Sequence, residues 1–154
     1  MDRKTQKLGE ILLQRGLVTQ EQVDEALREQ QLTKEFLGVI LIRKGFVAKE
    51  SFLKALSDQF KIPYVSLKDA DVDFNVAMRF SASAITEHKC LPIKQDETHV
   101  TIAITNPLDA WGLSKAEEEA RPFRVKWVLV SDDEINRLIV LYRQKVKENL
   151  RKLF

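Results

Sequence analysis

The sequence is poor in several residue types, and each shortage excludes a class of protein. Only one of its 154 residues is a cysteine, Cys90, so the chain can form no internal disulfide and no cysteine-based metal cluster. No apolar run approaches the about 20 residues that a transmembrane helix needs, and the polar N-terminus predicts no secretory signal peptide. The sequence therefore predicts a cytoplasmic protein with no inserted segment.

The chain also lacks a large excess of charge of either sign. The chain carries 25 Lys+Arg against 23 Asp+Glu, a formal net charge of +2, which gives no strong electrostatic case for binding nucleic acid or an anionic membrane. Hydrophobic residues make up 44% of the chain, which is enough to form a core and argues against intrinsic disorder. The length allows one ordinary domain or two small ones.

Familiar catalytic motifs are also absent. The sequence contains no G-x-x-x-x-G-K-[ST] phosphate loop, no G-x-G-x-x-G, no G-x-S-x-G and no H-E-x-x-H. Its two histidines, His88 and His99, have no cysteine spacing that would complete a zinc site. We interpret His88 and the nearby Cys90 as structural because no third ligand accompanies them. The sequence therefore predicts a protein that is not an enzyme and needs no metal or cofactor.

The first 60 residues contain an internal repeat. Residues 7–30 align with residues 36–59 at an offset of 29, and ten of the 24 aligned pairs are identical, where unrelated segments would share one or two. Such self-similarity indicates a duplicated supersecondary unit. The identical pairs are Leu8/Leu37, Gly9/Gly38, Ile11/Ile40, Leu12/Leu41, Gly16/Gly45, Val18/Val47, Glu21/Glu50, Ala26/Ala55, Leu27/Leu56 and Gln30/Gln59.

Each copy of the repeat predicts a helix, a short stop and a second helix. Apolar residues recur at helical spacing, and Gly16 stands where a left-handed residue would end the first helix. Thr19 and Gln22 form a capping box for the next helix. Ala48 replaces the capping threonine in the second copy, which weakens that helix start by about 1 kcal/mol. We predict a four-helix unit over residues 1–60.

Two glycines of the repeat need a separate explanation. Gly9 and Gly38 lie near the starts of predicted helices, at equivalent positions. Glycine inside a helix costs up to about 1 kcal/mol relative to alanine. A cost repeated at both positions indicates that something approaches the backbone closely there. Helix packing remains the plainer interpretation of the rest of the repeat.

Residues 61–154 predict a second, mixed unit with the order β-α-β-β-α-β-α. A hairpin is expected from two apolar runs, and Ser131 with Glu134 forms a capping box for a last helix. The predicted fold class is therefore α+β, a four-helix unit followed by a small α/β sandwich of sheet and helices. We expect strands at 61–67, 90–94, 99–104 and 124–130. We expect helical structure at 75–88, interrupted at Ser81 as a cap, and helices from the turn at 106–109 to 120 and from 131 onward.

The repeat resembles the MshEN domain, the N-terminal region of the hexameric ATPases that power type II secretion and type IV pili. The family pattern R-L-G-x-x-[LVI]-[LVI]-x-x-G-[LVI]-[LVI]-x(4)-L-x(3)-L-x-x-Q occurs twice with a five-residue spacer. Residues 7–30 and 36–59 match the two copies, with 31–35 as the spacer. Residues 90–93 and 103–109 look like the α/β domain that follows in those ATPases, whereas their catalytic region does not follow here.

Domains of that family bind cyclic di-GMP, and the resemblance implies the same ligand here. The ligand is two-fold, so two like half-sites can each contact one guanine and one phosphate. Backbone N–H groups near helix starts suit phosphate, and leucine and glutamine suit the face and edge of a purine. The implied ligand-binding positions are Lys7, Leu8, Gly9, Leu12, Gly16, Leu27, Gln30, Phe36, Leu37, Gly38, Leu41, Gly45, Leu56 and Gln59.

Lys7 and Phe36 stand where the family has arginine. Lysine offers only a point charge, and phenylalanine can stack on a base but donates nothing. Each lost hydrogen bond to a charged group costs about 1.5–3 kcal/mol.

Two hypotheses therefore stay open. The first is a non-catalytic regulatory module that binds cyclic di-GMP and relays this to a protein partner. The second is a protein–protein adaptor of a type II secretion or type IV pilus-like system that has lost nucleotide binding. The expected partner is a secretion or pilus assembly component or ATPase, not nucleic acid or membrane.

Overall fold

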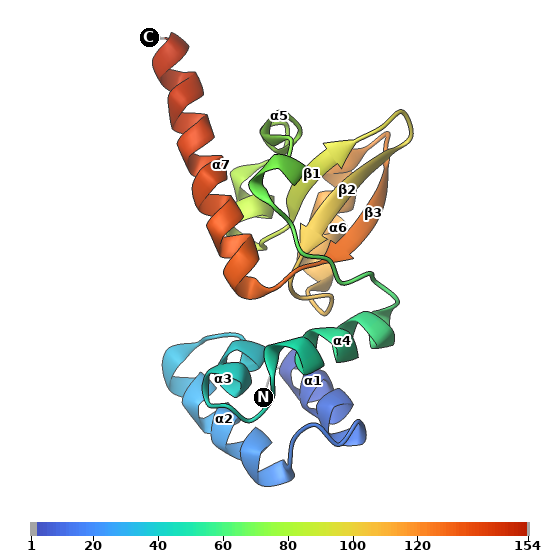
Figure 1. Ribbon diagram of the computed structural model, residues 1–154, viewed down its shortest axis with the longest axis vertical. Coiled ribbons are helices and arrows are strands. Elements are labelled where there is room, and N and C mark those ends of the chain that lie inside the picture. Colours follow the sequence, from blue (N-terminus) through green and yellow to red (C-terminus); the bar gives the residue numbers. More distant parts are fainter. Residues whose placement is uncertain (1–2, 154) are drawn as a thin grey trace. The chain divides into compact units, whose positions relative to one another are not determined.

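The computed structural model describes residues 3–153, with side chains from Lys7 onward (Figure 1). The chain divides into two compact units, Met1–Lys61 and Ile62–Phe154. The first unit is helical and the second combines helices with a three-stranded sheet, which confirms the predicted α+β class. Among the described residues, no helix is both long enough and apolar enough to cross a membrane.

The first unit contains the four helices that the repeat predicts. Gly16 and Gly45 follow the first helix of each copy with φ of +69° and +77°, a conformation that glycine adopts without strain. Thr19 and Gln22 form the predicted capping box, whereas Ala48 makes no side-chain cap. The helices are α1 (Arg3–Gln14), α2 (Gln20–Thr33), α3 (Leu37–Arg43) and α4 (Lys49–Phe60).

The second unit is built on a sheet with the strand order β1-β2-β3. The first two strands form the predicted antiparallel hairpin, and β2 pairs in parallel with β3 through a crossover that contains α6. The sheet and its helices share a core of fully buried aliphatic side chains that includes Ile102, Leu129 and Ile135. The elements are β1 (Leu91–Gln95), β2 (His99–Ile104), α6 (Ala110–Ala120), β3 (Arg124–Leu129) and α7 (Asp132–Leu153).

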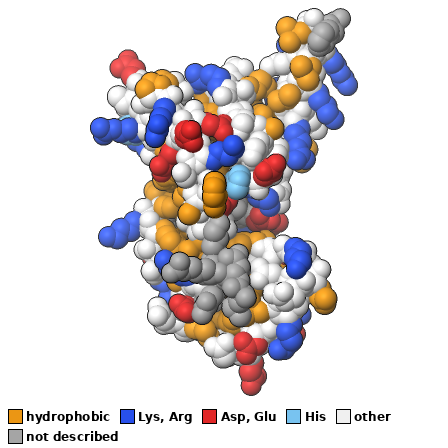
Figure 2. Space-filling model, turned by 180° about the vertical axis from the view of Figure 1, so that it is seen from behind, with side chains coloured by type: hydrophobic (Ala, Val, Ile, Leu, Met, Phe, Trp, Pro, Cys, Tyr) orange, Lys and Arg blue, Asp and Glu red, His pale blue; other side chains and the backbone are white. Residues whose placement is uncertain are grey.

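The last helix, α7, extends well past the rest of its unit (Figure 1). Its first turn is acidic and its last turn carries Arg151 and Lys152, so the charges at both ends suit the helix dipole. Basic side chains line the projecting end of the helix in Figure 2. The buried residues of α7 all lie in its first half, from Ile135 to Tyr142.

The predicted strand at 61–67 is wrong for most of its length. Tyr64 makes only an isolated parallel bridge with Leu129, and Lys61 adopts a left-handed conformation with φ of 55°. Pro63 has no N–H to donate, so it joins the sheet only through its carbonyl oxygen, which accepts from the Leu129 N–H at 2.8 Å.

The helical structure predicted over 75–88 is interrupted at Ser81, as expected, and the Ser81 hydroxyl oxygen accepts from the N–H of Ala84 at 3.1 Å. The structure has a short helix α5 (Phe74–Ala77) and then a π-helical turn η2 (Ser83–Glu87), preceded by a 3-10 turn η1 (Asp69–Asp71). Glu119 accepts hydrogen bonds from both the backbone N–H and the hydroxyl of Ser81, at 2.6 and 2.7 Å. This contact with α6 holds the backbone at Ser81 and marks the break between α5 and η2.

The hairpin turn provides a prediction about pH. The Asp96 carboxylate accepts the backbone N–H groups of Thr98 at 2.8 Å and His99 at 2.7 Å, and these bonds lower the pKa of Asp96 from 3.8 to about 2. Because the folded pKa lies below the unfolded one, Asp96 stabilises the fold above about pH 4 and loses this effect as the pH falls through about 2. We expect an NMR titration of the Asp96 carboxyl to have its midpoint near 2. A midpoint near 3.8 in the folded chain would contradict the turn geometry.

Candidate functional site

Both early glycines of the repeat lie where the two helices of one copy cross. A Cβ atom added at Gly9 would lie 3.3 Å from Cγ1 of Val23, and one added at Gly38 would overlap the ring of Phe52. Val23 and Phe52 are themselves equivalent positions, 29 residues apart. The close approach that the sequence predicts at these glycines is therefore made by the chain's own side chains, in the same way in both copies.

The two copies are related by a pseudo-two-fold exchange of contacts. The second helix of each copy contacts the first helix of the other: α2 packs on α3, and α4 packs on α1. Two ion pairs follow the same exchange: Arg15 approaches Asp58 at 3.9 Å, and Lys44 approaches Glu29 at 3.5 Å. Arg15 and Lys44 are equivalent positions, and so are Glu29 and Asp58. Reciprocal pairing of this kind is what a two-fold arrangement produces.

Half of the residues predicted to bind the ligand form the scaffold of the first unit. The five leucines of this group are 0–1% exposed, and the two glycines at the helix crossings are buried as well. In this structure these residues hold the four helices together and offer no side chain to solvent. They are Leu8, Gly9, Leu12, Leu37, Gly38, Leu41 and Leu56.

The other predicted residues are at least partly exposed. Gly16 and Gly45 lie in the exposed turns, Lys7 is exposed on α1, and Leu27 is half-buried on α2. The pattern of burial therefore separates the predicted set into a scaffold and a group that solvent or a ligand can reach.

The two glutamines each hold a neighbouring part of the unit. Gln30 donates from Nε2 to the backbone carbonyl of Glu35 at 2.9 Å, at the end of the spacer between the copies. Gln59 accepts at Oε1 from Nη2 of Arg15 at 3.2 Å, across the two copies. Gln59 therefore links the copies directly and Gln30 holds the spacer that joins them, although their own partners differ.

Phe36 occupies the N-cap position of α3 and makes no side-chain cap. Its half-buried ring meets the buried ring of Phe52 edge to face, with centroids 6.4 Å apart and an interplanar angle of 69°. Gln30 binds the carbonyl of the residue immediately before Phe36. The end of the first motif and the start of the second therefore lie close together.

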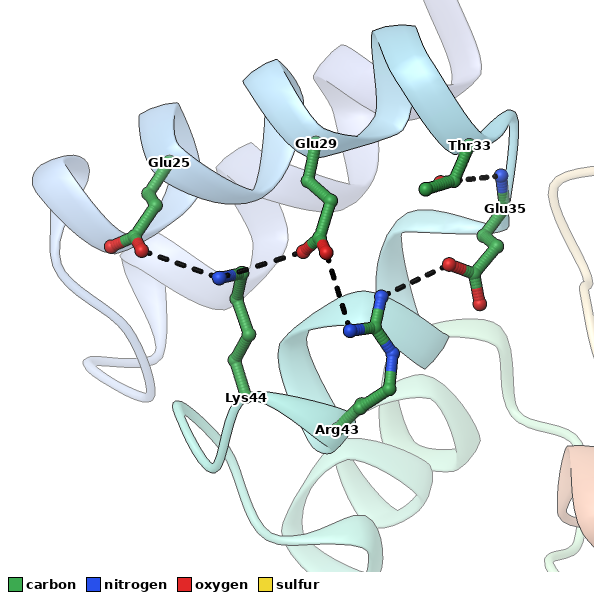
Figure 3. Close-up of polar contacts among 6 residues, drawn as sticks. All are labelled: Glu25, Glu29, Thr33, Glu35, Arg43 and Lys44. Carbon is green, nitrogen blue, oxygen red and sulfur yellow. Dashed lines mark hydrogen bonds and ion pairs between the residues drawn. The ribbon is translucent and has the colours of Figure 1, made fainter.

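A charged network between α2 and the segment from Glu35 to Lys44 was not predicted from the sequence (Figure 3). Arg43 donates to Glu29 at 3.2 Å and to Glu35 at 3.0 Å, and Lys44 lies 3.3 Å from Glu25. Burial raises the pKa of Glu29, but Arg43 and Lys44 more than offset this and lower it overall. The spacing of Glu25 and Glu29, one helical turn apart, was the available signal, but only the fold brings α3 against it.

The second unit shows what His88 and Cys90 do. Nδ1 of His88 lies 2.8 Å from Oδ2 of Asp109, and Asp109 caps α6 by accepting from the N–H of Gly112 at 3.0 Å. Cys90 is buried, and this burial raises the pKa of its thiol to about 12, which leaves it protonated and unreactive. In the described part of the chain, no group of three or more His, Cys, Asp or Glu side chains is placed to hold a metal ion.

The family model of the MshEN domain matches residues 60–149, which is more than half of the chain. The chain belongs to the MshEN domain family. The match lies over the second unit and the end of α4, whereas the resemblance in the sequence was strongest in the repeat that precedes it. Membership of this family confirms the predicted relationship to secretion and pilus ATPases.

The MshEN chain is also similar to individual proteins. It is 33% identical over 114 residues to the type IV pilus assembly ATPase PilB of Thermus thermophilus, and the matched part covers 73% of this chain but 13% of PilB. The solved structure of MshE with cdg, cyclic di-GMP, has a TM-score of 0.70 at 23% identity, covering 89% of this chain and 96% of that one. The N-terminal domain of XpsE has a TM-score of 0.65 at 19% identity, covering 90% and 96%. These structures share the fold of this chain.

Proposed function

We propose that this MshEN chain is a non-catalytic regulatory module that binds cyclic di-GMP across its two repeats. The observation that carries the proposal is the pseudo-two-fold exchange of contacts between the copies, shown by Arg15 with Asp58 and Lys44 with Glu29. Cyclic di-GMP is itself two-fold, so two like half-sites can bind its two halves. The similarity in fold to MshE with cyclic di-GMP supports the choice of ligand.

The burial of each predicted residue indicates whether it would support the fold or contact the ligand. The buried leucines and glycines would fix the positions of the helices, while side chains that solvent reaches would contact the ligand. Lys7 would supply a cation for a phosphate, and the ring of Phe36 would stack on a guanine. The side chains of this group that solvent reaches are the exposed Lys7 and Gln59 and the half-buried Leu27, Gln30 and Phe36.

Arg43 and Lys44 offset most of the negative charge that precedes the second motif. The carboxylates of Glu29 and Glu35 would repel a phosphate if they were free, but Arg43 binds both of them. Lys44 in turn binds Glu25 and Glu29. Three carboxylates thereby share two cations, which reduces the repulsion of a phosphate near the start of the second motif.

Isothermal titration of the full chain with cyclic di-GMP tests this proposal. We expect saturable binding of one ligand per chain, and a loss of affinity of about tenfold in Gln30→Ala, from which one hydrogen bond would be missing. Gln144→Ala, an exposed change on α7, is the matched control and should leave the affinity unchanged. No heat at ligand concentrations of about 1 mM would overturn the proposal.

The second candidate function is an adaptor that binds a secretion or pilus component without nucleotide. The packing of Phe36 on Phe52 favours it, because an aromatic contact has taken the place of a group that could donate to a guanine. Affinity capture with the full chain distinguishes the two candidates. An adaptor recovers such a component equally with and without cyclic di-GMP, whereas a regulatory module recovers it to an extent that the ligand changes.

A further inference from the structure

The outer edge of β3 is only partly covered by the chain. The extended segment from Pro63 to Val65 contacts this edge at one residue of β3, Leu129. The Leu129 N–H donates to the Pro63 carbonyl at 2.8 Å, and the Leu129 carbonyl accepts from the N–H of Val65 at 2.9 Å. This short parallel pairing ends there, since Tyr64 and Leu129 form an isolated bridge. The edge from Arg124 to Val128 extends beyond it.

The hydrogen bonds at the ends of β3 show which backbone groups point outward. The N–H groups of Arg124 and Val130 donate to Thr98 and Ile104, on the side of β2. In a parallel strand, the N–H and C=O of one residue both point to the strand on one side, and the N–H and C=O of the next residue both point to the opposite side. Val125 and Trp127 therefore point their N–H and C=O groups outward, as Leu129 does. No backbone group of the described residues bonds them on that side.

The surface beside this edge is hollow and basic. A depression of about 540 Å³ is lined by Pro63, Lys126 and Trp127 at the edge and by Lys94 on the far strand. Lys94 and Lys126 both pair with Thr101, so they flank it on one face of the sheet. Arg124, two residues before Lys126, lies on the same face.

One carboxylate, Asp96, also borders the hollow. It already accepts the backbone N–H groups of Thr98 and His99, and it offsets part of the charge of Lys126, so the lining has two lysines against one carboxylate. The edge of β3 therefore combines backbone donors and acceptors at Val125 and Trp127, which no backbone group of the described residues binds, with an excess of positive charge beside them.

We infer that this edge binds an extended acidic segment of a partner protein, which adds to the sheet as a strand beside β3. Backbone bonds to Val125 and Trp127 would supply affinity, and alternate side chains would supply specificity. Acidic side chains of the segment would face Arg124 and Lys126, while the residues between them would lie against the half-buried Val125 and Trp127. The segment that fits therefore alternates acidic and apolar residues.

A second copy of this chain fits the same edge poorly. Pairing of β3 with its own copy would place Arg124 and Lys126 opposite like charges, which destabilises a strand pair. Charged side chains at an edge are a common means of preventing such pairing. The edge also belongs to the second unit, so binding there is independent of whether the helical repeat binds cyclic di-GMP.

Amide hydrogen exchange of the labelled full chain, followed by NMR, tests this inference, because bound and unbound amides should alternate along β3. In the free chain we expect Val125 and Trp127 to exchange rapidly while Lys126 and Val128 are protected. A short peptide of alternating glutamate and valine should slow Val125 and Trp127 by about tenfold or more, while a peptide of alternating lysine and valine should not. The amides of Lys126 and Val128 should stay as they were.

Lys126→Glu should abolish the slowing by the acidic peptide. Lys147→Glu, which makes the same charge change on the exposed part of α7, is the matched control and should preserve it. The inference is overturned if millimolar acidic peptide slows neither amide, or if both peptides slow them equally. It is also overturned if the two amides become protected without peptide as the chain is concentrated, because a second copy would then be the occupant.

Discussion

Gly38→Ala is expected to lower the free energy of unfolding by about 2 kcal/mol, because a Cβ at this position would overlap the Phe52 ring. Phe52 is 3% exposed and its ring also meets Phe36, so it has little room to move away. Overpacking of a core costs about 1–3 kcal/mol, and the gain in helix propensity returns up to about 1 kcal/mol. The effect is therefore destabilising overall.

Gly9→Ala, at the equivalent position, is the matched control. Its Cβ would lie 3.3 Å from Val23, which has to yield by only a few tenths of an ångström. The gain in propensity then offsets the strain, and the free energy of unfolding should change by less than about 1 kcal/mol. Urea unfolding of both variants followed by circular dichroism measures the difference.

A double variant shows whether the ring is the cause. Phe52→Val makes the second crossing resemble the first, where Val23 meets Gly9. In the Phe52→Val background, Gly38→Ala should cost at least about 1 kcal/mol less than in the parent chain, and the double-mutant cycle gives that coupling directly. Equal costs in the two backgrounds would show that the Phe52 ring does not limit the crossing.

The fold of the first unit follows from local signals that can be read along the sequence. Leucines at helical spacing, a capping box at Thr19 and glycines at the turns all determine structure within a few residues. The second unit depends more on contacts between distant residues. The serine itself indicates the break at Ser81, because it caps the turn that follows, but its partner Glu119 lies 38 residues away and no local pattern indicates that contact.

The candidate site shows a different limit of sequence reasoning. The leucine and glycine positions that carry the family resemblance are also the positions that a helical repeat needs for its core, so the pattern alone does not separate scaffold from ligand contact. Burial separates them, with Leu12 and Leu41 in the core and Gln30 partly exposed. The exchange of ion pairs made by Arg15 and Lys44 depends on how the copies pack, which identity between the copies does not specify.

Placing arginine at positions 7 and 36, where the family pattern has arginine, is expected to tighten cyclic di-GMP binding by about 10- to 100-fold for each arginine, if the site lies as proposed. A guanidinium donates through a planar fork, which can bind two acceptors of a guanine or phosphate at once. Lys7→Arg changes an exposed side chain and keeps its charge. Phe36→Arg places a donor where the chain now has only a ring.

The surroundings of Phe36 allow this change. The aliphatic stem of an arginine can cover the ring of Phe52 while its head stays in solvent. The carboxylate of the preceding residue, Glu35, is already bound by Arg43 at 3.0 Å, so it competes less for the new guanidinium. Phe36→Lys is the control, because it adds the same charge without the fork and should gain less affinity than Phe36→Arg.

Isothermal titration of the single and double variants with cyclic di-GMP measures these gains, with urea unfolding to show that each variant is folded. A folded double variant with unchanged affinity would mean that positions 7 and 36 do not contact the ligand. The packing of Phe36 on Phe52 would then be part of the scaffold, like the buried leucines. In that case the adaptor function would be the better account, because the exposed surface of the repeat would be free to bind a protein in place of a nucleotide.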